Sequence, residues 1–119
     1  MARILIVEDE PLISMMLEAW LADLGHEPVG PVTTVVAALE SLTQPDFAAA
    51  ILDVNLRGER SDQVADALAK LNIPFVVASG DSADAIAPRF ADRPYLRKPY
   101  GFAALHLAVQ ALTGGESPA

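Results

Sequence analysis

Residues 48–58 read AAAILDVNLRG, and this stretch decides the fold class. Its continuous apolar run ends at Asp53, and two residues that favour turns, Asn55 and Gly58, follow directly. An apolar run without polar alternation predicts a strand that is buried on both faces, as the strands of a parallel sheet are. A carboxylate at the end of such a strand has no role in the sheet itself, so Asp53 is the first candidate functional residue.

On both sides of this strand, short apolar segments alternate with segments of helical periodicity. We predict strands at 4–7, 27–32, 48–52, 74–78 and 94–97, and helices at 11–24, 35–42, 61–71, 81–87 and 102–112. This alternation predicts an α/β fold, a doubly wound five-stranded parallel sheet in flavodoxin-like order 2-1-3-4-5 with helices on both faces. Residues 1–113 are expected to form one domain, and residues 114–119 a short polar tail.

The composition fits a single small domain and excludes several kinds of site. The chain has 119 residues, of which 52% are hydrophobic, and it contains no cysteine for disulfides, zinc–thiolate sites or a thiol nucleophile. A net charge of −8 disfavours direct binding of nucleic acid, because the phosphate backbone is also negative. No segment resembles a signal peptide or is long enough to span a bilayer, so we predict a cytoplasmic protein without membrane contact.

Polar and charged residues follow four of the predicted strands at the point where each strand ends. Glu8 and Asp9 follow the first strand, Asp53 the third, Ser79 the fourth and Lys98 the fifth. In doubly wound sheets, ligands bind outside the carboxyl ends of the strands, at the switch point between strands 1 and 3. We therefore expect these side chains to form one site.

The chemistry of this set favours phosphoryl transfer to a carboxylate. Clustered carboxylates repel one another, and a divalent cation removes that conflict. Ligands that are all oxygen atoms suit Mg²⁺, which would also let an anionic phosphoryl group approach an anionic nucleophile. Lys98 supplies a counter-charge, and Asp53 is the natural nucleophile.

Four short motifs together resemble a known family. They are VEDEP at 7–11, LDVNLRG at 52–58, VASG at 77–80 and KP at 98–99. In this order, and over essentially the full length, they resemble the response-regulator receiver domain of two-component signalling, within the CheY-like superfamily. Each motif alone is also consistent with an ordinary turn or helix start, and the specificity lies in the combination.

The resemblance implies a role for each site residue. Asp53 would be the phospho-acceptor, taking the phosphoryl group from a phosphohistidine of a sensor histidine kinase or phosphotransfer protein. Lys98 would neutralise phosphoryl oxygens and Ser79 would hydrogen-bond the attached group, while Tyr95 would act with Ser79 as the conformational switch. The implied Mg²⁺ ligands are Asp9, Asp53, the backbone carbonyl of Asn55 and, through a water, Glu8.

The resemblance also implies how the protein would signal. It would catalyse only its own phosphorylation and dephosphorylation, so it would not be an enzyme acting on other substrates. Phosphorylation would switch the face of the fourth helix, fifth strand and fifth helix, for binding to an unknown downstream protein. We expect a stand-alone receiver, a monomer or a phosphorylation-dependent dimer, in a pathway that the sequence does not identify.

Several alternatives remain open at this stage. The chain could be a receiver cut from a hybrid kinase or a longer regulator, or a pseudo-receiver that binds partners without phosphorylation. An Mg²⁺-dependent phosphatase is disfavoured because Asn55 cannot serve as the acid that such enzymes carry two residues after the nucleophile. A flavin carrier is disfavoured because Glu8 and Asp9 occupy the loop that would bind the flavin phosphate.

Three departures from the family pattern are visible in the sequence. Arg57 stands where many receivers have proline, which predicts a different stiffness of that loop. Tyr100 stands where phenylalanine is more common, and this change is expected to be mild. Residues 81–93 contain few large apolar side chains and are interrupted by Pro88, so the predicted fourth helix is expected to be short or mobile.

Overall fold

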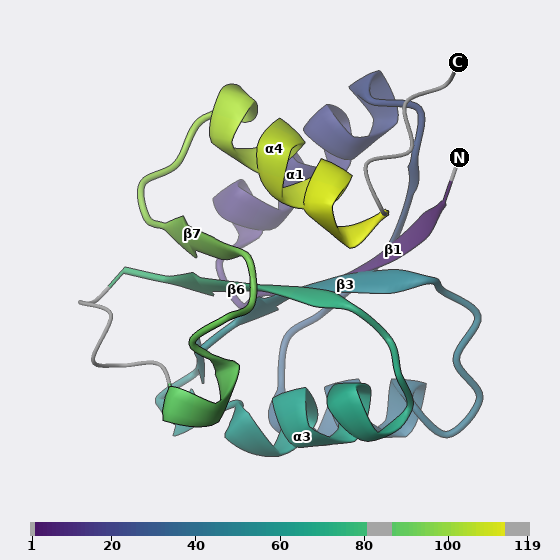
Figure 1. Ribbon diagram of the computed structural model, residues 1–119, viewed down its shortest axis with the longest axis vertical. Coiled ribbons are helices and arrows are strands. Elements are labelled where there is room, and N and C mark those ends of the chain that lie inside the picture. Colours follow the sequence, from purple (N-terminus) through teal and green to yellow (C-terminus); the bar gives the residue numbers. More distant parts are fainter. Residues whose placement is uncertain (1, 81–86, 114–119) are drawn as a thin grey trace.

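A computed structural model of the chain describes residues 2–80 and 87–113, and its centre is a five-stranded parallel sheet (Figure 1). The strand order is β2-β1-β3-β6-β7, which confirms the predicted topology. The strands are β1 (Arg3–Val7), β2 (Glu27–Val32), β3 (Ala49–Asp53), β6 (Phe75–Ser79) and β7 (Tyr95–Arg97). The helices are α1 (Pro11–Asp23), α2 (Val35–Ser41), α3 (Asp62–Lys70) and α4 (Phe102–Leu112). The predicted helix at 81–87 falls almost wholly, and the predicted tail entirely, outside the described residues.

The central strands send alternate side chains to opposite faces of the sheet, and each face has its own apolar core. In β1, Leu5 and Val7 pack toward α2 and α3, whereas Ile4 and Ile6 pack toward α1 and α4. Figure 1 shows the result, with α1 and α4 above the sheet and α3 below it. Both faces of the sheet are therefore covered, as the continuous apolar strands predict.

A short hairpin of two strands and a 3₁₀ helix were not predicted from the sequence. An antiparallel hairpin of β4 (Asn55–Leu56) and β5 (Glu59–Arg60) follows β3 directly. Its two loop residues have positive φ angles, 53° at Arg57 and 84° at Gly58, as a two-residue hairpin turn requires. A 3₁₀ helix, η2 (Pro88–Phe90), precedes β7.

The η2 helix is attached to the rest of the fold in two ways. Phe90 enters the core and meets the Phe75 ring edge to face, with 5.7 Å between ring centroids. Arg89 forms a two-pronged ion pair with Asp66 on α3, at 2.8 and 2.9 Å. Phe90 supplies a large apolar anchor in a segment that the sequence suggested was poor in such residues.

Within residues 2–80 and 87–113, the structure contains no candidate for a membrane-crossing helix. None of the helices in these ranges combines the length and the apolar character that such a crossing needs.

Candidate functional site

The predicted site residues come together at the carboxyl ends of the parallel strands. Glu8 and Asp9 lie in the loop between β1 and α1, and Asp53 is the last residue of β3. Ser79 ends β6, and Lys98 directly follows β7. Glu8, Asp53 and Ser79 are buried, with relative exposures of 2%, 5% and 2%. Buried carboxylates without a structural role in the core mark this edge as the candidate functional site.

Lys98 is the centre of the site. Its ammonium nitrogen lies 3.0 Å from an oxygen of Glu8 and 3.0 Å from Oδ2 of Asp53. The same nitrogen lies 3.3 Å from Oε1 of Glu10, whose side chain is largely exposed. One positive charge therefore holds three carboxylates, two of which are almost completely shielded from water.

The charges in this cluster shift the protonation equilibria of its members. The pKa of the Glu8 carboxyl is raised to about 7, first by burial and then by hydrogen bonding and charge repulsion with Asp53, against a lowering by the hydrogen bonds from Lys98 and the Glu10 backbone. Burial alone would lower the pKa of Lys98, but hydrogen bonds and charge attraction from Asp53 and Glu8 outweigh it, so the net shift is upward. Lys98 is thus permanently charged, while Glu8 is close to its titration point at neutral pH.

The β4–β5 hairpin holds Asp9. The backbone N–H of Arg57, in the hairpin turn, donates a hydrogen bond of 2.9 Å to Oδ2 of Asp9. Proline at this position could not make the contact, because it has no N–H and cannot adopt a φ of 53°. The departure from proline at Arg57 is therefore a structural feature of the site.

We expect the substitutions Arg57→Gly and Arg57→Pro to have opposite consequences. The glycine variant keeps the N–H and removes the steric strain of a side chain in the left-handed region. The free energy of unfolding of Arg57→Gly should therefore lie within about 1 kcal/mol of that of the wild type. Proline removes a hydrogen bond to a charged group and forces a new backbone conformation, which should cost about 2 kcal/mol. Urea unfolding followed by Trp20 fluorescence measures both, and equal stability of the two variants would contradict this role of the turn.

Two further contacts fix the end of β3. The backbone N–H of Asn55 donates to Oδ1 of Asp53 at 3.2 Å, and the Ser61 hydroxyl donates to the backbone carbonyl of Asp53. Ser61 is only 1% exposed, and it precedes α3 without capping that helix through its side chain. From the sequence, Ser61 is predicted only as the first residue of a helix, and no signal in the sequence links it to Asp53.

Ser79 and Tyr95, the two residues predicted to act together as the conformational switch, lie close to each other in the sheet. They are on neighbouring strands, since Ser79 pairs with Arg97 at the end of β7 and Tyr95 begins the same strand. Tyr95 is half-buried and packs against the core on the α3 side of the sheet. Their predicted switch role stays a prediction.

The acidic residues provide a donor set suited to a small divalent cation. Carboxylate oxygens of Glu8, Asp9 and Glu10 lie within 4.8 Å of one another. The oxygens of an octahedral Mg²⁺ shell lie at most about 4.2 Å apart, so this spacing leaves room for a cation that some of these acids hold directly and others through a bound water. Exposed acidic groups alone would be weak support for a metal site. Here Glu8 is buried, and Lys98 contacts both Glu8 and Asp53, which brings a further carboxylate close to the group.

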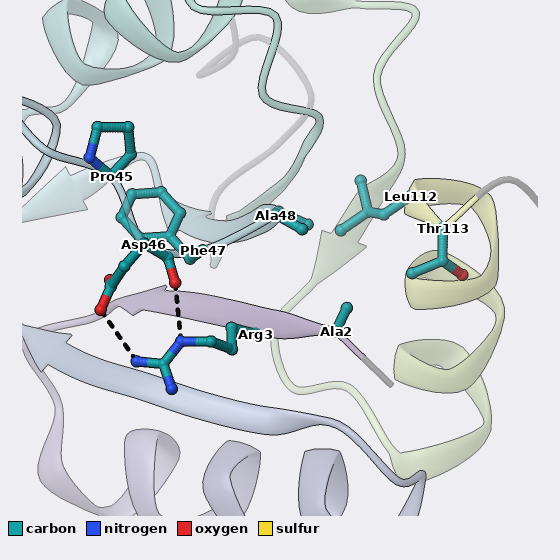
Figure 2. Close-up of a pocket in the computed structure, with 9 residues that line it drawn as sticks. Ala2, Arg3, Pro45, Asp46, Phe47, Ala48, Leu112 and Thr113 are labelled. Atoms are coloured by element: carbon teal, nitrogen blue, oxygen red, sulfur yellow. Dashed lines mark hydrogen bonds and ion pairs between the residues drawn. The ribbon is translucent and has the colours of Figure 1, made fainter.

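A separate cavity of about 650 Å³ lies at the opposite, amino-terminal edge of the sheet, and Figure 2 shows its walls. Arg3 is the positively charged residue in the wall of this cavity. Its guanidinium group donates hydrogen bonds to the backbone carbonyl of Asp46 at 2.7 Å and to the Asp46 carboxylate at 3.1 Å. The remaining walls shown are mostly apolar. The length of the sheet separates this cavity from Asp53, and we assign it no function.

A doubly wound five-stranded sheet with acids, a buried aspartate and a lysine at its carboxyl edge defines the receiver class of signalling domains. The chain matches the family model of the response regulator receiver domain over residues 4–110. It belongs to that family, which confirms the family predicted from the motifs.

Individual relatives agree with this assignment. The solution structure of SdrG from Sphingomonas melonis Fr1 is 53% identical, with a TM-score of 0.86 and coverage of 95% of this chain and 97% of SdrG. The crystal structure of TrrA from Thermotoga maritima in complex with Mg²⁺–BeF is 26% identical, with a TM-score of 0.81 and coverage of 94% and 99%.

A sequence relative, the transcriptional regulatory protein CutR from Streptomyces coelicolor, is 32% identical over 117 residues. This match covers 92% of the present chain and 52% of CutR. The chain spans about half or less of the length of the curated relatives that it matches.

Proposed function

We propose that the protein is a phospho-accepting receiver of a two-component phosphorelay, with Asp53 as the acceptor. The observation that carries the proposal is the contact of Lys98 with both Asp53 and Glu8, each at 3.0 Å, in a buried site at the strand ends. A buried acid pair with a single counter-charge is poorly suited to a structural role, because apolar residues would stabilise the core as well or better.

The transfer would be an in-line displacement at phosphorus. An oxygen of the Asp53 carboxylate attacks the phosphorus of a phosphohistidine, the P–N bond breaks and a P–O bond forms, and the leaving imidazole remains on the partner. Lys98 already contacts Asp53, so a short movement would bring its ammonium to the new phosphoryl oxygens. Ser79 would hydrogen-bond the attached group, and Tyr95 would respond to its movement.

The donor set supports Mg²⁺ as the cofactor. Asp9, Asp53 and the backbone carbonyl of Asn55 would hold the cation, with Glu8 acting through a water. When bound, the cation would neutralise the acids and the incoming phosphoryl group. The Mg²⁺–BeF complex of TrrA, a relative with the same fold, supports this choice.

We further propose that this chain acts on no substrate other than its own acceptor. Asn55 stands at the position where a phosphatase would need an acid. The site residues lie at the carboxyl edge of the sheet, where the described elements do not enclose a substrate. The pseudo-receiver alternative is disfavoured because Asp9, Asp53, Ser79 and Lys98 are all present and assembled at one edge.

The partners would be a sensor histidine kinase or phosphotransfer protein on one side and a downstream protein on the other. The surface of β7 and α4 is suited to the second role. Helix α4 carries no acidic residue, lysine or arginine, and Leu107 on it is 69% exposed. An apolar helix face of this kind is typical of an interaction surface. We place the protein in the cytoplasm, where such a phosphorelay would operate.

The test of the proposal is phosphorylation by a small acyl-phosphate donor, with and without Mg²⁺, followed by intact mass. We expect the gain of a single phosphoryl group, about 80 Da, that is labile to base and that depends on Mg²⁺. Phosphorylation that is unchanged when Mg²⁺ is removed by a chelator would refute the metal-dependent mechanism. Absence of phosphorylation, combined with absence of Mg²⁺ binding in calorimetry, would refute the receiver function as a whole.

A further inference from the structure

Glu10 contacts Lys98 but has no part in the proposed phosphoryl transfer. Its Oε1 atom lies 3.3 Å from the Lys98 ammonium nitrogen, and its side chain is 60% exposed. Glu8 and Asp53, the other two carboxylates on that ammonium, have side chains that are only 2% and 7% exposed. Glu10 therefore stands on the solvent side of the site, from which a dissolved phospho-donor must approach Asp53.

The local structure does not require the negative charge of Glu10. Glu10 is the N-cap residue of α1, but its side chain makes no capping hydrogen bond, and glutamate is not a preferred residue at this position. The structural contacts come from its backbone, whose N–H donates to Glu8 at 3.1 Å and whose carbonyl accepts from the N–H of Ser14 at 3.0 Å. Glutamine would keep both contacts, so the charge can be removed by itself.

The charge of Glu10 acts with opposite signs on the two ions that the site would bind. Its carboxylate lies within 4.8 Å of those of Glu8 and Asp9, where a further negative charge attracts Mg²⁺. The same charge repels a phosphoryl anion. It also holds the Lys98 ammonium, which the phosphoryl oxygens would need as their counter-charge. Glu10 thus favours the cation and opposes the anion.

We propose that Glu10 is a specificity-determining residue that disfavours small, free acyl phosphates as phospho-donors to Asp53. The proposal rests on the proposed function, because it requires that Asp53 accepts a phosphoryl group. A protein donor can present a lysine or arginine to the exposed carboxylate of Glu10 while its phosphohistidine reaches Asp53, which cancels the repulsion. A free acyl phosphate carries no such cation, so it meets the full repulsion.

The test compares wild type with Glu10→Gln and with the matched control Glu40→Gln. Glu40 is exposed near the end of α2, so the control makes the same change in net charge away from the site. At saturating Mg²⁺, Glu10→Gln should bind beryllofluoride, the anionic phosphoryl mimic in the TrrA complex, about fivefold more tightly in calorimetry. It should also be phosphorylated about fivefold faster by a subsaturating acyl phosphate, but should bind Mg²⁺ alone about threefold more weakly. Glu40→Gln should match wild type in all three measurements.

The opposite signs separate this role from a structural one. Loss of a favourable interaction between Glu10 and the dipole of α1 would lower stability without tightening the binding of an anion. The gain in beryllofluoride affinity should also shrink in about 1 M salt, which screens exposed charges.

Three results would overturn this inference alone. The first is a beryllofluoride affinity of Glu10→Gln that equals or falls below that of wild type. The second is an equal gain in Glu40→Gln, which would assign the effect to net charge. The third is a loss of Mg²⁺ affinity of more than about 100-fold in Glu10→Gln, which would make Glu10 a metal ligand. A wild type that binds neither Mg²⁺ nor beryllofluoride would overturn the proposed function, and this inference with it.

Discussion

Asp53→Asn is expected to reduce phosphorylation by an acyl-phosphate donor to less than about 1% of wild type, because an amide is not a nucleophile of comparable strength. The fold should survive. In the wild type, the backbone N–H of Asn55 donates to Oδ1 of Asp53, and the side-chain amide oxygen of the variant can accept the same hydrogen bond. Intact mass after incubation with donor and Mg²⁺ measures the effect. Asp23→Asn is the matched control, since Asp23 is exposed at the end of α1, and it should be phosphorylated like wild type.

The same substitution has a second expected effect, on Glu8. Burial is the main reason that the pKa of Glu8 is about 7, and Asp53 contributes through hydrogen bonding and charge. In Asp53→Asn that pKa should fall, without reaching its usual value of 4.5, because the burial remains. A carboxyl titration by NMR measures this. An unchanged Glu8 pKa would contradict the coupling, and phosphorylation at wild-type stoichiometry would refute Asp53 as the acceptor.

The convergence of Asp53, Glu8 and Lys98 could be predicted from the sequence because a parallel sheet brings the carboxyl ends of its strands to one edge. Apolar runs located the strands, and each polar residue stood directly after one of them. The spacing along the chain, 45 residues between Asp53 and Lys98, had no influence on the prediction. The meeting of these three residues at one edge follows from the order and direction of the strands, so it could be predicted from the sequence alone.

The contacts that the sequence did not predict depend on backbone conformation or on orientation. Arg57 reaches Asp9 because it adopts a positive φ, which is rare for a residue with a side chain and is not indicated by its type. Ser61 bonds to the carbonyl of Asp53 instead of capping α3, a choice between two partners that spacing cannot decide. The hydroxyl of Tyr100 is buried without a hydrogen-bond partner among the described residues, and this can be recognised only once its surroundings are known.

Lys98→Met should have the largest effect on stability, lowering the free energy of unfolding by about 3 kcal/mol at pH 8. Glu8 and Asp53 would then share a buried site without a counter-charge, and their side chains are only 2% and 7% exposed. Lys70→Met, at the exposed end of α3, is the matched control, and it should change stability by less than about 0.5 kcal/mol. Urea unfolding at several pH values measures both variants.

The pH dependence of this deficit has a defined sign. Glu8 titrates near 4.5 when unfolded and near 7 when folded, so the folded state binds more protons between these values and stability falls as the pH rises. Removing Lys98 raises the folded pKa further, so the fall continues to higher pH and the deficit relative to wild type is larger at pH 8 than at pH 5. Saturating Mg²⁺ should narrow the deficit at pH 8, because a cation on the same carboxylates replaces the lost charge. A deficit that is independent of both pH and Mg²⁺ would mean that Lys98 contributes by packing alone, and that the buried acids do not depend on its charge.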